Sequence, residues 1–175
     1  LLTHRGGFYD WVSIDNGSDD ALLEAYSTGY FANRLWLMSP PGAFWNYSNP
    51  NYSLAGLVAE KSAGIVYRDL LAERVFEPLS MGRTFFLAEE VEADGDYAVS
   101  ESPDWTGDST AILRVEPDSY DDAWSRPAGF AWSNVANVLE FVEFLLEGDE
   151  SVLSAQWQQA MISPQVDTDQ FLDLE

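Results

Sequence analysis

The chain has 175 residues, of which 46% are apolar, and this is enough to bury the core of a single domain. Thirty acidic residues against eight basic ones give a formal net charge of −22 at pH 7. A surface of this sign repels phosphate backbones and anionic headgroups, which argues against nucleic acid or membrane surfaces as partners. The chain has no cysteine and one histidine, so we expect no disulfide, no metal site and no cofactor.

Two explanations of the acidity stay open. One is adaptation to high salt, where screening relieves the self-repulsion of the surface, and the other is an ordinary solvated acidic surface. No apolar run approaches the ~20 residues needed to span a bilayer, so we expect no membrane insertion in this segment.

Hydrophobic periodicity predicts three helices in the first half of the chain. The first begins after Asp19-Asp20 and continues to Phe31. A second opens at Asn49-Pro50, with Asn49 as N-cap and Pro50 at the first helical position, and ends at Gly64. A third, shorter helix covers residues 67–75 and ends before Pro78.

The second half combines an irregular excursion with two further helices. Residues 88–126 show little periodicity, and we expect only short strands there, at 97–99 and 111–113. Ser133 is the expected N-cap of an amphipathic helix that ends at Gly148. A last helix is predicted over residues 154–161.

The most informative motif lies where a loop becomes the second predicted helix. An aromatic cluster, Phe44-Trp45, leads into Tyr47-Ser48-Asn49. This order places a phenol and a carboxamide side by side on a rigid backbone junction within reach of a substrate. Tyr47 is equally a candidate packing residue beside the aromatic cluster. Asn49 is equally a candidate helix cap, and both of its roles are compatible if its oxygen caps while its amide N–H reaches the cleft.

Other polar residues receive structural interpretations. His4, the single histidine, invites assignment as a general base, but no serine or aspartate forms a recognisable triad with it. We therefore predict that His4 is a structural loop residue. Glu60 and the pair Glu140 and Glu143 lie on helix faces, where we expect solvated rather than catalytic carboxylates.

Tyr47-Ser48-Asn49 resembles the Tyr-x-Asn motif of the penicillin-recognising serine hydrolases, especially their class C β-lactamase-related branch. Three further blocks stand in the order that this family has. Leu1–Gly7 resembles the Leu-Leu-Thr-His-Thr-Ser-Gly segment of the family. Val75–Gly82 resembles its Phe-x-Pro-Leu-Gly-Met signature. Pro127–Ser133 resembles its Pro-Ala-Gly-Gly-x-x-Ser segment. Arg5-Gly6 stands where the family usually has Thr-Ser, and Phe130 stands where it usually has Gly. We therefore expect an altered substrate cleft.

Two elements that the resemblance implies are not in these residues. The nucleophile of the family lies in a Ser-x-x-Lys motif, and the sole lysine, Lys61, follows no serine at that spacing. The downstream Lys-Thr-Gly or His-x-Gly strand is also missing. We therefore expect residues 1–175 to form a single incomplete domain, the middle segment of a larger enzyme.

The fold that the resemblance implies is mainly α: the helical lobe of the α/β β-lactamase/transpeptidase-like fold, with long irregular loops and short strands. The missing α/β lobe of the same protein would be its partner. The implied activity is that of a serine hydrolase that forms an acyl-enzyme on β-lactam, D-amino-acid peptide or ester substrates. Tyr47 would shuttle the proton, and Asn49 would bind the acyl side of the substrate and orient the lysine. The fragment alone is expected to be inactive.

A second hypothesis of another class stays open. The chain is then a non-catalytic relative that binds peptidoglycan or peptides, or an interaction domain that retains the fold. A Ser-x-x-Lys upstream of residue 1 would favour the enzyme. The resemblance also favours a periplasmic or extracellular location.

Overall fold

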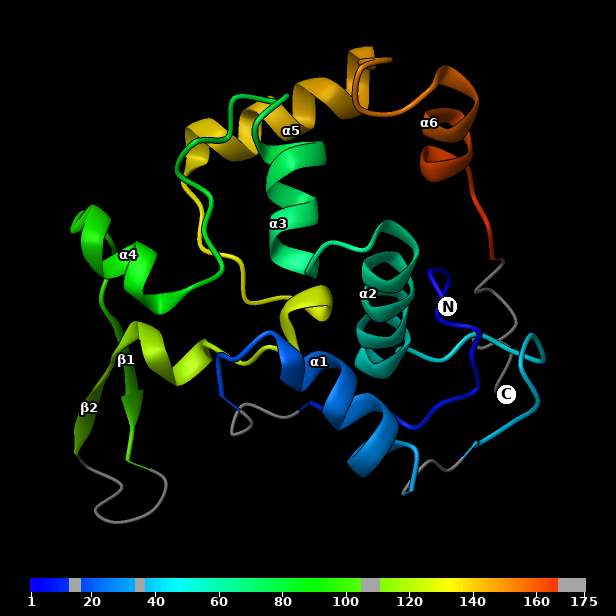
Figure 1. Ribbon diagram of the computed structural model, residues 1–175, viewed down its shortest axis with the longest axis horizontal. Coiled ribbons are helices and arrows are strands. Elements are labelled where there is room, and N and C mark those ends of the chain that lie inside the picture. Colours follow the sequence, from blue (N-terminus) through cyan, green and yellow to red (C-terminus); the bar gives the residue numbers. More distant parts are fainter. Residues whose placement is uncertain (13–16, 34–36, 105–110, 167–175) are drawn as a thin grey trace, which may run out of the picture.

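The computed structural model describes residues 1–12, 17–33, 37–104 and 111–166, and this part of the chain is mainly helical, as predicted (Figure 1). The α-helices are α1 (Ala21–Ala25), α2 (Asn49–Ala63), α3 (Tyr67–Leu71), α4 (Ala88–Asp94), α5 (Val135–Glu147) and α6 (Ala155–Ile162). Wider π-helical turns extend α1 through Tyr26–Phe31 and α3 through Ala72–Phe76. Strands β1 (Ser100–Pro103) and β2 (Ile112–Val115) pair as an antiparallel hairpin at one edge of the molecule (Figure 1). Two 3₁₀ turns follow, at Pro117–Tyr120 and Arg126–Ala128.

The five predicted helices are confirmed, but two of their caps were assigned to the wrong residue. Ser48 is the N-cap of α2, with an extended backbone at φ −160° and ψ 117°, so Asn49 is the first helical residue. Asn134, not Ser133, caps α5, because its side chain accepts a 2.9 Å hydrogen bond from the Asn137 backbone N–H. The Ser133 hydroxyl instead lies 2.8 Å from the hydroxyl of Thr84.

The excursion at residues 88–126 is more regular than predicted. Helix α4 was missed, and the strands lie a few residues from the expected positions. The Ala88 amide at the start of α4 donates to the Asp121 carboxylate at 2.9 Å. Val91 on the same helix is buried. The hydrogen bond to Asp121 and the burial of Val91 both depend on the tertiary fold. The short acidic sequence of this helix therefore shows no periodic pattern that predicts it.

The hydrophobic core has two centres. Leu23, Phe31 and Trp124 form the first, against which α2 packs with Leu54 and Leu57. The second centre joins the segment after α3 to α5 through buried side chains, Leu79, Met81 and Phe144. Helix α2 also lies against the 3₁₀ turn Arg126–Ala128. A Cβ at Gly56 would come within 2.3 Å of the Pro127 side chain, so only glycine allows this approach.

A buried ion-pair network joins three distant segments beside the first core. The Arg126 side chain is only 3% exposed, and its guanidinium lies 2.6 Å from the Asp20 carboxylate and 2.7 Å from that of Asp121. Arg126 also donates to the Ser18 carbonyl at 2.6 Å. Arg68 on α3 binds the second oxygen of Asp20 at 2.9 Å. The network therefore fixes the starts of α1 and α3 against the Pro-Ala-Gly turn.

The prediction of a solvated carboxylate was wrong for Glu60 and is confirmed for Glu140 and Glu143, which are exposed. Glu60 is only 8% exposed, and its carboxylate accepts a 3.0 Å hydrogen bond from the Tyr67 amide at the start of α3. Here a buried acid satisfies a helix N-terminus from the preceding helix. Burial raises the pKa of the Tyr67 phenol to about 12, so this phenol stays neutral at physiological pH.

The surface charge leads to a test of the two explanations of the acidity. Several of the few basic side chains already pair locally, for example Arg83 with Asp94 and Arg114 with Glu116. Eight basic residues cannot offset the mutual repulsion of thirty acidic ones. Surface ion pairs of this kind also contribute little stability. If the acidity is a salt adaptation, the melting temperature of the protein should rise between low and molar NaCl, as the Debye length shrinks to about 3 Å. A melting temperature that stays flat across this range would indicate an ordinary acidic surface.

Candidate active site

The N-terminal segment lies against the loop that precedes Tyr47. Backbone hydrogen bonds run from Met38 to the Gly7 carbonyl, from Gly42 to that of Arg5 and from Asn46 to that of His4, at 2.7, 2.7 and 2.9 Å. The Arg5 guanidinium also donates to the Gly42 carbonyl. The Leu1–Gly7 block thus supports the Tyr-x-Asn motif directly, although some forty residues separate them in the sequence.

His4 holds the backbone of the motif. Its Nδ1 accepts a 3.1 Å hydrogen bond from the Ser48 amide, which places the proton of the neutral ring on Nε2. Its ring contacts the rings of Tyr47 and Tyr52, with ring centroids 4.7 and 5.0 Å away. These contacts fit the predicted structural loop role, because Ser48 meets the ring through its backbone amide while its hydroxyl donates to the Tyr9 carbonyl.

Tyr47 and Asn49 lie together at the start of α2. The Tyr47 hydroxyl donates to Asn49 Oδ1 at 3.2 Å. The Tyr47 side chain is 50% exposed, so it is not a core packing residue, although its ring rests on His4. A phenol and a carboxamide therefore meet at a rigid junction and remain open to solvent.

Asp10 binds Asn49 and was not identified from the sequence. One carboxylate oxygen of Asp10 accepts both the Asn49 backbone N–H at 2.8 Å and the Asn49 side-chain N–H at 2.9 Å. The expected capping of the helix by the Asn49 side-chain oxygen was therefore wrong. Its oxygen does not cap the helix but faces Tyr47, and its amide nitrogen faces Asp10. Asp10 is one of thirty acidic residues, and no local spacing relates it to Asn49.

The structure shows the local surroundings of both departures from the family pattern. Gly6 packs under α2, and a Cβ there would lie 2.1 Å from Asn51 Oδ1 and 2.7 Å from the Phe8 ring. A serine at this position would require these neighbours to move. Phe130 keeps a left-handed backbone with φ 61°, a conformation that favours glycine and costs about 1–2 kcal/mol with a side chain. Its ring packs against Tyr120, with centroids 5.8 Å apart.

Lys61 does not belong to this site. It follows Asn49 by twelve residues on α2, which corresponds to about 18 Å along the helix axis. Its ammonium lies 2.6 Å from the Glu24 carboxylate. That hydrogen bond raises the pKa of Lys61, so it remains a cation held at the far end of the helix. The Lys61 ammonium is therefore remote from Tyr47 and Asn49.

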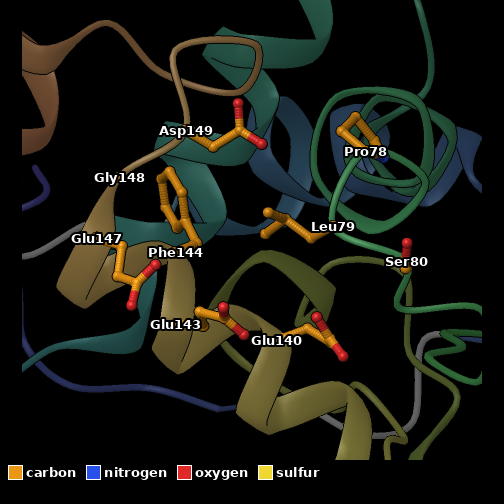
Figure 2. A pocket seen from close by; sticks show the side chains of 9 residues that line it. All are labelled: Pro78, Leu79, Ser80, Glu140, Glu143, Phe144, Glu147, Gly148 and Asp149. Atoms are coloured by element: carbon orange, nitrogen blue, oxygen red, sulfur yellow. The ribbon is translucent and has the colours of Figure 1, made fainter.

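A separate pocket of about 230 Å³ opens between the end of α5 and the turn at Pro78–Ser80 (Figure 2). Four carboxylates surround it: Glu140, Glu143, Glu147 and Asp149. Hydrogen bonds from Ser151 lower the pKa of Asp149, so this group is ionised at neutral pH. Within the described ranges, no three acidic or histidine side chains are grouped to hold a metal ion. The pocket shares no residue with the Tyr-x-Asn motif, and we do not assign the reaction to it.

Comparisons with known proteins identify the family of the chain. The family model described as Beta-lactamase matches residues 1–174. The chain is 25% identical over 172 residues to Beta-lactamase-like protein 2 of Dictyostelium discoideum, covering 94% of this chain and 29% of that protein. It is 33% identical over 78 residues to a D-aminopeptidase of Cereibacter sphaeroides, covering 45% of this chain and 13% of that one.

Among solved structures, the octameric penicillin-binding protein homologue from Pyrococcus abyssi superposes with a TM-score of 0.68 at 25% identity. The match covers 90% of this chain and 36% of that one. The family match and the fold thus define a protein of the β-lactamase and penicillin-binding-protein class. The chain belongs to the beta-lactamase family. It spans less than a third of the length of the two curated relatives above.

No helix in the described residues has both the length and the apolar composition needed to cross a membrane.

Proposed function

We propose that this chain is the helical part of a serine hydrolase, in which Tyr47 and Asn49 belong to the catalytic site. The observation that carries the proposal is the 3.2 Å hydrogen bond between the exposed Tyr47 hydroxyl and Asn49 Oδ1, at the start of α2. The family match over residues 1–174 supports the same assignment.

The proposed reaction is acyl transfer through a covalent intermediate. A serine hydroxyl, supplied by a Ser-x-x-Lys motif outside these 175 residues, attacks the acyl carbon, and its proton passes to the Tyr47 phenolate. The Ser-x-x-Lys lysine keeps the phenol ionised, since a neighbouring cation lowers the pKa of a tyrosine. As the tetrahedral intermediate collapses, Tyr47 returns the proton to the departing amine or alkoxide. Water then hydrolyses the acyl-enzyme and releases the serine.

Asn49 is proposed to orient the other groups. Its Oδ1 accepts from the tyrosine hydroxyl here and is equally suited to accept from a lysine ammonium. Its amide nitrogen carries two protons, of which Asp10 binds one, and the second suits a carbonyl oxygen on the acyl side of the substrate.

Residues 1–175 are proposed to form a single incomplete domain that packs against an α/β lobe of the same protein. The outer side of α5 supports this, because it presents a row of exposed apolar side chains: Val135, Val138, Leu139, Val142 and Leu146. Leu146 is 80% exposed, and contiguous apolar surface of this kind commonly marks an interface.

D-amino-acid peptides or amides are the proposed substrate class. The 33% identity to a D-aminopeptidase over 78 residues supports this choice over β-lactams and simple esters. The full-length protein should therefore hydrolyse a D-alanine p-nitroanilide faster than nitrocefin or p-nitrophenyl acetate. Equal inertness toward all three would favour the non-catalytic peptide-binding alternative.

The isolated 175 residues should have no catalytic activity, because they contain no Ser-x-x-Lys motif. We expect no hydrolysis of nitrocefin or p-nitrophenyl esters and no covalent labelling by fluorescent penicillin, measured by intact-protein mass spectrometry. The full-length protein serves as the positive control. Stoichiometric acylation of the 175 residues would contradict the proposal and direct the search for a nucleophile to Ser48, Ser53 and Ser133.

A further inference from the structure

We propose that Asp10 is a positioning residue that fixes the orientation of the Asn49 carboxamide. The inference rests on the proposed function of Tyr47 and Asn49, to which it adds a residue that acts through Asn49 without touching the substrate.

The contact geometry determines which way the carboxamide points. The same Asp10 oxygen accepts from the Asn49 backbone at 2.8 Å and from its side-chain nitrogen at 2.9 Å. An ionised carboxylate only accepts hydrogen bonds. A flip of the Asn49 amide would therefore bring Oδ1 against the Asp10 carboxylate and replace a charge-assisted bond with repulsion.

The fixed orientation provides the acceptor that the proposed chemistry needs. With its nitrogen held by Asp10, Asn49 directs Oδ1 toward the Tyr47 hydroxyl at 3.2 Å. A flipped amide would instead present N–H donors to the lysine ammonium of the proposed mechanism, and a donor cannot bind an ammonium. Without Asp10, both orientations of the carboxamide become accessible.

Asp10 itself is held by its neighbours in the sequence. The Ser48 hydroxyl donates to the Tyr9 carbonyl at 3.3 Å, and the Asn46 side chain donates to the Phe8 carbonyl at 3.1 Å. The carboxylate also faces the N-terminus of α2, where the helix dipole favours a negative charge. Asp10 is therefore anchored at the motif, although its side chain is exposed.

The test compares Asp10→Ala and Asp10→Asn in the full-length protein. Asparagine keeps an oxygen that can accept both Asn49 hydrogen bonds, whereas alanine keeps none. Two quantities are measured during covalent labelling by a fluorescent fluorophosphonate. The final labelled fraction gives the amount of folded sites, and the labelling rate reports the geometry of those sites. We expect Asp10→Ala to slow labelling by roughly 10- to 100-fold at an unchanged final fraction, the scale of a lost bond to a charged group. Asp10→Asn should recover most of that rate.

Asp19→Ala is the matched control. Asp19 is exposed and accepts a 3.0 Å bond from the Ala21 backbone at the start of α1, so this variant makes the same change in charge and loses a similar helix-terminal bond. It should label at the wild-type rate. In a cycle with Asn49→Ala, the double variant should be no slower than Asn49→Ala alone, because Asp10 acts through Asn49.

The possible failures are distinguishable. Labelling by Asp10→Ala within about twofold of wild type, while Tyr47→Phe is slow, would overturn the role of Asp10 and leave the proposed function intact. Additive losses in the double variant would also overturn it. A wild-type protein that is not labelled at all would overturn the proposed function and this role with it.

Discussion

Replacing Tyr47 by Phe in the full-length protein is expected to lower kcat/KM by roughly 10²–10⁴-fold, the usual range for a general acid–base group. The change removes only the hydroxyl that bonds Asn49 at 3.2 Å, while the ring keeps its contact with His4. Because the side chain is half exposed, the melting temperature should barely move. Steady-state kinetics at saturating and sub-saturating substrate, together with calorimetry, provide the measurement.

Tyr52→Phe is the matched control for this change. Tyr52 also contacts the His4 ring, and its hydroxyl donates to the Leu2 carbonyl at 2.9 Å. The control therefore removes a hydroxyl from the same aromatic group without touching Asn49. It should cost about 1 kcal/mol of stability and little activity. Similar kinetic losses in both variants, tracking their melting temperatures, would show that Tyr47 is a packing residue.

Arg126→Met should be strongly destabilising. Methionine keeps an unbranched side chain but leaves Asp20 and Asp121 without the guanidinium that lies 2.6 and 2.7 Å from them. Breaking a buried ion pair by removal of one partner costs about 3–5 kcal/mol, because the remaining charge is uncompensated. Urea unfolding of the full-length protein should show the loss as a lower midpoint at an unchanged slope.

Arg74→Met provides the comparison at the surface. Arg74 pairs with Glu73 at 3.0 Å, but the two side chains are 66% and 52% exposed. Solvent screens such a pair, so we expect a loss below about 1 kcal/mol. Equal losses in the two variants would mean that the buried network contributes no more than a surface pair.

The sequence alone was sufficient for features that depend on near neighbours in the chain. Apolar spacing located α2 and α5, and Gly64 ends α2 as predicted, with φ 70°. The pairing of Tyr47 with Asn49 was also predictable, since two residues at a loop-to-helix junction have few ways to lie apart. Helix hydrogen bonds and side-chain spacing involve residues that are close in the sequence, so a pattern of neighbouring residues is sufficient to predict them.

The tertiary structure decided everything that depends on distant partners. Asp10 lies 39 residues before the Asn49 amide that it binds, and Asp121 lies 33 residues after the Ala88 amide at the start of α4. Glu60 is buried because α3 folds back onto it, and Gly6 lacks room for a side chain because Asn51 lies above it. The orientation of the Asn49 carboxamide follows from the first of these contacts. Periodicity and motifs describe which residues stand near one another along the chain, whereas these contacts form only when the packed core brings remote segments within hydrogen-bonding distance.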